Sequence, residues 1–149
     1  MIELVMATLA HVGPIATRMR HWDQVECEAH RKLPKQALRL GLAGSIDVFT
    51  AKLDGRPEAM MGLVPVNALT GEGSPWFLGT EAVYDNPRAM LAFAPHVLGK
   101  WRDSTPCLES IVANGNARAI RLLRKWGFTI GNEVRMVGDV PFVTFRMEG

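Results

Sequence analysis

The dipeptide Asp54-Gly55 constrains this chain most, because it lies between two apolar runs, 46–53 and 58–66. An Asp-Gly pair readily takes the positive φ angles of a tight hairpin turn, so the two runs are expected to pair as antiparallel strands. Helical patterns lie on both sides of this hairpin, which argues against an all-helical chain and against a doubly wound parallel sheet. We therefore predict an α/β fold of the α+β kind, with a mixed, mostly antiparallel central sheet flanked by helices.

The spacing of apolar residues places the elements before the hairpin. A first strand is predicted over 2–8, and the helix after it has one apolar face at three- and four-residue spacing: Val12, Ile15, Met19 and Trp22. A second helix is predicted from Pro34 to about Gly44. The charged segment 23–32 between them is left open, because it fits no single pattern.

The elements after the hairpin complete what we expect to be a single domain, 1–149. They are a third strand of the meander (the fourth of the chain), a helix, a strand, a strongly amphipathic helix and a final strand, at 76–80, 87–101, 108–113, 117–126 and 141–147. Pro95 lies inside the first of these helices, so we expect a kink or two shorter helices there. Trp126 and Phe128 close the apolar face of the last helix and the following strand, so both should be substantially buried.

Composition and charge exclude several classes of function. The 149 residues carry a formal net charge of +2, which gives no strong positive field for binding nucleic acid. No apolar stretch approaches the roughly 20 residues that cross a bilayer, and no basic segment precedes the apolar N-terminus as in a secretory signal. Cys27 and Cys107 lack paired spacing and are expected to be free thiols. We expect a soluble, intracellular protein without nucleic acid or a membrane segment.

One segment carries a resemblance to a known family. Residues 116–128 read Asn-Ala-Arg-Ala-Ile-Arg-Leu-Leu-Arg-Lys-Trp-Gly-Phe, which resembles the N-x-x-A-x-x-L-Y-x-K-x-G-F segment of the GNAT (Gcn5-related N-acetyltransferase) family. The predicted order of strands and helices is also that of the GNAT fold. The resemblance implies acetyl-CoA as the cofactor of an active member, held in a splayed gap between the fourth and fifth strands, and an amine as the acetyl acceptor.

The chain is also similar, over nearly its full length, to small GNAT-like proteins of tailed bacteriophages, including internal virion proteins of short-tailed phages. The segments that carry this similarity most clearly are 73–80 and 123–130. The similarity implies a location in the cytoplasm of a host cell or in the virion. It also implies a phage or host protein as a partner.

The turn that would hold the coenzyme departs from the family pattern. GNAT enzymes bind the coenzyme A pyrophosphate on a glycine-rich turn, because glycines let the backbone approach and a helix N-terminus offers free amides. The corresponding stretch here, 80–88, contains no glycine, and Pro87 removes one amide donor. An Asp85 or Asn86 side chain at the cap is expected to accept hydrogen bonds from the first-turn amides, which leaves Arg88 to restore the charge balance.

The catalytic candidates follow from the same comparison. The acid tyrosine of the family corresponds to Leu123, which has no titratable proton, so an active member would use Tyr84, water or no acid. Glu81, at the end of the third meander strand, either reaches an amine through water as a general base or is a solvated loop carboxylate. These two residues are the predicted catalytic pair.

Six residues are candidates for contact with the coenzyme: Phe77, Leu78, Gly79, Asn86, Arg88 and Asn116. Asn116 either touches the pantetheine arm or only caps the helix that follows it. Gly79 either lets a ligand approach the strand closely or marks a bulge. Phe77 and its neighbour Trp76 either line an acyl pocket or belong to the core.

Two other groups of polar residues have alternative interpretations. Asp23, Cys27 and His30 would share one face if their segment were helical, but no second half-site accompanies them, so no metal site is predicted. Four basic residues of the last helix either meet a phosphate or are simply solvated: Arg118, Arg121, Arg124 and Lys125.

Two functions therefore stay open. In the first, the chain is an acetyl-CoA-dependent N-acetyltransferase that acts on an amine. In the second, it is a noncatalytic virion or host-interaction protein that keeps the GNAT fold as a binding scaffold and has no cofactor. The glycine-free turn and the leucine at the acid position favour the second function. We accordingly predict that acetyl-CoA binds with a Kd weaker than roughly 1 mM.

Overall fold

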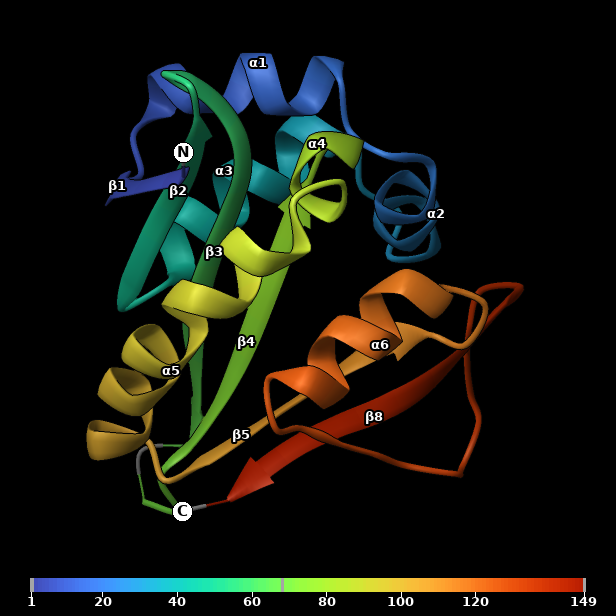
Figure 1. The fold of residues 1–149 in the computed structure, drawn as a ribbon. Helices are drawn as coiled ribbons and strands as arrows, with labels where there is room; N and C mark the ends of the chain where they lie inside the picture. The colour runs from blue at the N-terminus through green and yellow to red at the C-terminus, as the bar shows by residue number, and fades with distance from the viewer. Residues whose placement is uncertain (1, 68, 149) are drawn as a thin grey trace.

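The computed structural model describes residues 2–67 and 69–148, which form one eight-stranded sheet with helices on both faces (Figure 1). The strand order is β1-β2-β3-β4-β5-β8-β6, and β7 pairs with β8. Every pair of neighbouring strands is antiparallel except β4 and β5, which are parallel. The predicted mixed, mostly antiparallel sheet flanked by helices is confirmed.

The bounds of the elements follow the chain in order. The strands are β1 (Ile2–Met6), β2 (Asp47–Leu53), β3 (Arg56–Asn67), β4 (Glu72–Gly79), β5 (Cys107–Ala113), β6 (Thr129–Ile130), β7 (Arg135–Val137) and β8 (Val140–Glu148). The helices are the 3-10 turn η1 (Leu9–His11), α1 (Val12–Thr17), α2 (His21–Ala29), α3 (Pro34–Gly44), α4 (Glu81–Tyr84), α5 (Pro87–Ser104) and α6 (Ala117–Lys125). Within the described residues, no helix has the length and apolar character needed to span a membrane.

The predicted hairpin is present where β2 turns into β3. Asp54 and Gly55 have φ angles of 51° and 83°, as a tight turn with two left-handed residues requires. The two strands then pair from Leu53↔Arg56 outward, with one register shift next to Ala51. The dipeptide therefore sets the register of the longest strand in the sheet, β3.

The N-terminal helix predicted through Trp22 is wrong, because the chain breaks between Thr17 and His21. The reason lies at Arg20, whose backbone is extended (φ −66°, ψ 153°) and whose N–H donates to the Gly79 carbonyl at 3.0 Å. A helical Arg20 could not make this bond to the end of β4. The segment left open in the sequence, 23–32, is helical as far as Ala29, where α2 ends.

Two predictions near the C-terminal half need correction. Pro95 lies inside one continuous helix, α5, so the alternative of two shorter helices is wrong. Pro95 is on the exposed side of α5, away from the core. Phe128 is buried as predicted and contacts Phe145 edge-on at 5.0 Å between ring centroids. Trp126 is only half-buried, although its ring packs against the core.

The core is divided by the sheet into two clusters. One cluster lies under α5 and α6, and the other lies under α1, α2 and α3. Alternation along β4 sends Trp76 to the second cluster and Phe77 to the first. Trp76 lies so close to Gly41 of α3 that a Cβ atom on Gly41 would come within 2.5 Å of the indole ring. Both faces of β4 are therefore fixed by packing up to the point where the strand ends.

Candidate functional site

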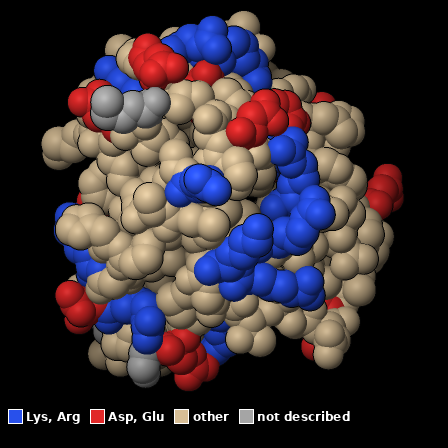
Figure 2. Space-filling model, viewed as in Figure 1, with Lys and Arg blue, Asp and Glu red and all other residues tan. Residues whose placement is uncertain are grey.

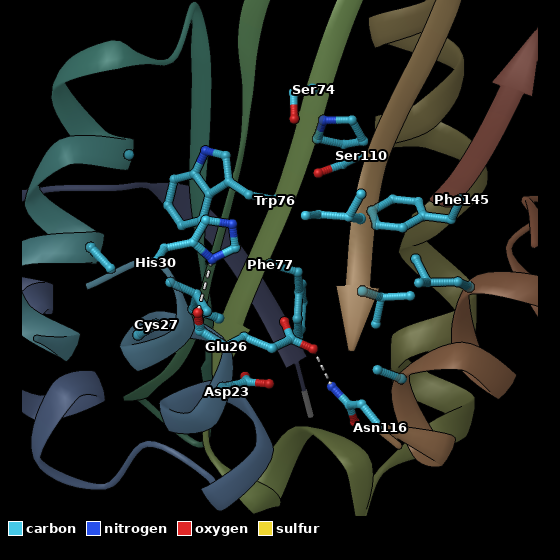
Figure 3. A pocket seen from close by; sticks show the side chains of 18 of the residues that line it. Asp23, Glu26, Cys27, His30, Ser74, Trp76, Phe77, Ser110, Asn116 and Phe145 are labelled. Carbon is cyan, nitrogen blue, oxygen red and sulfur yellow. Dashed lines mark hydrogen bonds between the residues drawn. The ribbon is translucent and has the colours of Figure 1, made fainter. Parts of the chain in front are cut away.

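A gap between β4 and β5 is a concave feature of the molecule. The two strands pair only at Glu72↔Cys107 and Gly73↔Leu108, and beyond that point they diverge (Figure 1). A cavity of about 530 Å³ lies along the gap. Figure 3 shows α2 on one side of it and Asn116, at the start of α6, on the other. The prediction of a splayed gap between the fourth and fifth strands, drawn from the family resemblance, therefore has a counterpart in the fold.

Backbone groups at the ends of the two strand edges that face this gap are hydrogen-bonded to residues of the segment 18–29. Thr80 donates its N–H to the Glu58 carbonyl in β3, so the alternation of the strand turns the polar groups of Gly79 toward the gap. The Gly79 N–H donates to Asp23 Oδ2 at 2.8 Å, and the Gly79 carbonyl accepts from the Arg20 N–H. The ends of the gap-facing edge of β4 therefore have partners within the chain.

The end of β5 across the gap is also hydrogen-bonded to a carboxylate of α2. The Ala113 N–H donates to Glu26 Oε2 at 3.0 Å, and the same oxygen accepts from Asn116 Nδ2 at 2.9 Å (Figure 3). Glu26 thus links α2 to the last residue of β5 and to the first turn of α6. Together with Asp23, it joins both sides of the gap to one helix.

Arg20 lies at the centre of this network and is almost completely buried, as are Asp23 and Asn116. Its Nη1 donates to Asp23 Oδ1 at 2.9 Å and to Asn116 Oδ1 at 3.1 Å. We call these three residues and Glu26 the α2 clasp. A charged cluster buried this deeply is stable only while each member keeps its partners.

The side chain of Asn116 therefore serves the α2 clasp and does not cap α6. Asn116 lies at the N-cap position of α6, but its side chain makes no hydrogen bond to the first-turn amides, so the expected side-chain capping is wrong. The amide instead donates to Glu26 and accepts from Arg20, which uses both of its polar ends. Its predicted contact with a coenzyme stays a prediction, but that contact would have to displace one of these two bonds.

Glu81 and Tyr84 lie together on α4 beside the clasp. Glu81 forms ion pairs with Arg20 Nε at 3.5 Å and with Arg118 Nη1 at 3.1 Å, so it is not a free loop carboxylate. The Tyr84 ring lies under the Arg20 guanidinium at 4.2 Å and edge-on to Phe77 at 6.3 Å. Burial of the phenol, with Asp23 nearby, raises the pKa of Tyr84 above its ordinary value. Neither predicted catalytic role is tested by this geometry.

In the turn after β4, the side chains of Asp85 and Asn86 take other hydrogen-bond partners than the helix amides that the sequence suggested. Asn86 Nδ2 donates to the Ala82 carbonyl at 2.8 Å, and its side chain caps no helix, so the expectation that it occupies the first-turn amides of α5 is wrong. Asp85 instead accepts from Arg118 at 3.4 Å. Arg88 is exposed at the start of α5. The internal contacts that compete with a coenzyme lie at the strand ends and not at this helix cap.

The candidates on β4 have distinct positions. Phe77 and Leu78 both line the cavity, from opposite faces of the strand. Gly79 is buried against β3, where a Cβ atom would come within 2.8 Å of the Ala59 Cβ and 2.9 Å of the Glu58 carbonyl. Its register with Ala59 is regular, so the alternative of a bulge at Gly79 is wrong.

The remaining polar groups do not assemble a metal site. Within 2–67 and 69–148, no three His, Cys, Asp or Glu side chains are placed to hold a metal ion. Cys27 contacts the Met19 sulfur, and His30 Nδ1 contacts the Glu26 carbonyl. Cys27 and Cys107 are free, as predicted. Figure 2 shows the basic residues of α6 as a continuous surface stripe, of which Arg118 is tied to the carboxylates of the turn.

Sequence reasoning missed Arg20 and Glu26, although one signal was present. Arg20, Asp23 and Glu26 recur at three-residue spacing, which places their side chains on neighbouring positions of one helical face. Charged residues at such spacing usually face solvent. Their burial follows from the position of α2 across the gap, which no local pattern specifies.

The buried carboxyl of Asp23 makes stability depend on pH. Burial raises the pKa of Asp23 from 3.8 to about 7, and Arg20 offsets only part of this rise. A carboxyl with a higher pKa in the folded state binds its proton more tightly there than in the unfolded chain. Its contribution to stability is therefore fully present below the unfolded pKa and is lost as the pH rises toward about 7. Burial also raises the pKa of Glu26, which acts in the same direction.

We therefore expect the free energy of unfolding to fall more steeply between about pH 4 and about pH 7 in the wild type than in Asp23→Asn. Asparagine keeps an acceptor for the Gly79 N–H but has no proton to release. His11, whose pKa is lowered by burial, gives an opposite slope in both proteins, so their difference isolates Asp23. Urea denaturation across this range measures both slopes, and equal slopes would contradict the assignment.

Comparison with known proteins supports the fold. No protein-family model and no curated protein matches the chain. The structure of AAC(6')-Ib with ribostamycin and coenzyme A has a TM-score of 0.70 at 16% identity, and the match covers 99% of this chain and 93% of that one. The ribosomal-protein-S18-alanine N-acetyltransferase from Escherichia coli has a TM-score of 0.69 at 15% identity, covering 99% and 94%.

A third structure, RimL, an L7/L12 α-N-protein acetyltransferase in complex with coenzyme A, has a TM-score of 0.66 at 13% identity and covers 99% and 93%. Identities this low show the fold alone, and the chain has a GNAT-like fold. The similarity to phage virion proteins stays a prediction, because these comparisons do not bear on it.

Proposed function

We propose that this chain is a noncatalytic binding protein that uses the GNAT fold as a scaffold. One observation carries the proposal: the backbone groups of Gly79 and Ala113 that face the gap between β4 and β5 are hydrogen-bonded to Arg20, Asp23 and Glu26. A coenzyme lying in the gap would compete with these bonds. Displacing them would leave buried charges without partners, which costs several kcal/mol.

The absence of a suitable proton donor supports the same proposal. Tyr84 is the single tyrosine of the chain, and its ring is covered by Arg20. The position of the family's acid tyrosine is Leu123, an apolar residue that lines the cavity. Burial raises the pKa of Cys27 to about 12, so this thiol stays protonated at neutral pH and is a poor nucleophile.

The phage similarity suggests the biological context of such a scaffold. A virion or host protein would be its partner, as that similarity implies. The alternative function, acetyl transfer to an amine, is suggested by the structural neighbours that are acetyltransferases or complexes with coenzyme A. An activity measurement separates the two functions.

We expect no release of coenzyme A thiol above the uncatalysed background when the protein is incubated with acetyl-CoA and a panel of amines. The panel should include a polyamine, an aminoglycoside and peptides with free N-termini, and the thiol is detected by a chromogenic disulfide. The E. coli S18-alanine acetyltransferase, with its peptide substrate, serves as the positive control in the same assay. Protein-dependent turnover with any amine would overturn the proposal.

A further inference from the structure

We infer that a groove between α6 and the segment 131–134 binds an acidic segment of a partner protein, with two arginines along its rim and apolar side chains on its floor. The groove has a volume of about 500 Å³, and among the described residues it shares no lining residue with the cavity between β4 and β5. The inference rests on the proposed function, because it names the chemistry of the partner that a binding scaffold would hold.

The positive charge of the rim comes from Arg121 and Arg124 of α6. Both are exposed, and their three-residue spacing places them on neighbouring positions of the helix, along which Figure 2 shows basic side chains gathered. Arg118 of the same helix is held by the carboxylates of Glu81 and Asp85. In the part of the chain that the structure describes, no carboxylate forms an ion pair with Arg121 or Arg124. These two guanidinium groups are therefore free to pair with carboxylates of another protein.

The floor of the groove is apolar. Ile120 of α6 and Ile130 of β6 are half-buried there, and Val143 of β8 is buried. Val134, in the wall formed by the segment 131–134, is 51% exposed. Burial of an apolar side chain against these residues is favourable. A partner segment that carries both carboxylates and an apolar side chain therefore fits the rim and the floor together.

β8 holds the wall segment in place at both ends. The Gly131 N–H donates to the Thr144 carbonyl at 2.8 Å, and a Cβ atom on Gly131 would overlap the Thr144 hydroxyl. After the segment, Arg135 begins β7, which pairs with β8. A groove that is already formed costs a ligand less ordering entropy on binding.

Two side-chain amides add hydrogen-bonding groups for a peptide backbone. Asn114 and Asn132 both line the groove and are exposed. Neither side chain has a hydrogen-bond partner among the residues that the structure describes. An amide both donates and accepts, so each can pair with the N–H and C=O groups of an extended segment.

The composition of the groove disfavours other anionic ligands. None of its lining residues in the described chain is aromatic, so it offers no ring on which the bases of a single-stranded nucleic acid could stack. The apolar floor is recessed, so the surface of a bilayer would not reach it. Glu133 lies in the wall segment but is exposed and does not line the groove, so its charge opposes that of the two arginines without cancelling it.

The test uses three acetylated and amidated peptides with a fluorescent label. The first is Glu-Leu-Glu-Glu-Leu-Glu, the second has glutamine at every acidic position, and the third has serine in place of both leucines. Fluorescence anisotropy at low ionic strength gives each affinity. We expect the first peptide to bind at least tenfold more tightly than either of the others. A smaller preference over either peptide would overturn the inference, and so would tighter binding of an oligothymidylate of the same net charge.

Two double variants locate the bound peptide. Arg121→Gln/Arg124→Gln should lower the affinity for the first peptide at least tenfold. Lys35→Gln/Arg39→Gln removes the same net charge from exposed positions of α3, on the other face of the sheet, and should change that affinity less than twofold. Equal losses in the two double variants would overturn the assignment of the peptide to the groove.

Two single variants test the wall segment. Val134→Ser should weaken binding of the first peptide and leave binding of the serine peptide unchanged, because only the first has an apolar side chain to bury. Glu133→Gln removes a negative charge beside the groove and should strengthen binding of the first peptide. The opposite result in either variant would contradict the inference.

The proposed function fails separately. Turnover of acetyl-CoA with an amine would overturn that function, whether or not the acidic peptide binds. Loss of the preference for the acidic peptide without any turnover would overturn this inference alone.

Discussion

Replacing Arg20 with methionine should lower the free energy of unfolding by about 3–5 kcal/mol at about pH 9, above the pKa of about 7 that burial gives Asp23, because it leaves the buried Asp23 carboxylate without its cation. The side chain of Arg20 also donates to Asn116 and covers the ring of Tyr84, so its loss removes contacts on three elements at once. Methionine preserves much of the apolar volume of the arginine stem. The expected loss is therefore mainly electrostatic.

Two controls make this result specific. Arg39→Met, at an exposed position of α3, should change stability by no more than about 0.5 kcal/mol. The double variant Arg20→Met/Asp23→Leu removes the unpaired charge together with its partner and should recover part of the loss, as replacement of whole buried ion pairs often does. Guanidinium denaturation gives all three values. A loss below about 1 kcal/mol in Arg20→Met would show that the clasp does not hold α2 against the sheet.

The sheet was predictable because its signals are local. The positive φ angles that Asp54 and Gly55 adopt are available to that dipeptide without context, and the hairpin fixes two strands. The apolar face of α6 likewise follows from spacing within nine residues. The break before α2 was not predictable, because it depends on a hydrogen bond between Arg20 and Gly79, which are far apart in the sequence.

The site was predicted less well, for a related physical reason. Asn116 and Asn86 were assigned as caps because asparagine before a helix usually is one. In the fold, stronger partners are close: Arg20 and Glu26 for Asn116, and the Ala82 carbonyl for Asn86. The sequence shows which groups can form hydrogen bonds. Tertiary structure decides which partner each group takes.

Acetyl-CoA should bind with a Kd weaker than roughly 1 mM, which corresponds to a binding free energy no stronger than about −4 kcal/mol. The reason differs from the one suggested by the sequence, because the amides of α5 are not taken by Asn86. The competing contacts are the bonds of the α2 clasp to Gly79 and Ala113. The carboxylates of Glu81 and Asp85 add negative charge at the turn, where they hold Arg118.

Calorimetric titration of the intact protein with acetyl-CoA tests the central claim, that the α2 clasp competes with the coenzyme for the backbone groups of Gly79 and Ala113 in the gap between β4 and β5. The E. coli S18-alanine acetyltransferase, titrated under the same conditions, controls for the quality of the ligand. We expect no saturable heat up to about 1 mM acetyl-CoA. Saturable binding at micromolar concentration would contradict the claim and would restore acetyl transfer as the function of this fold.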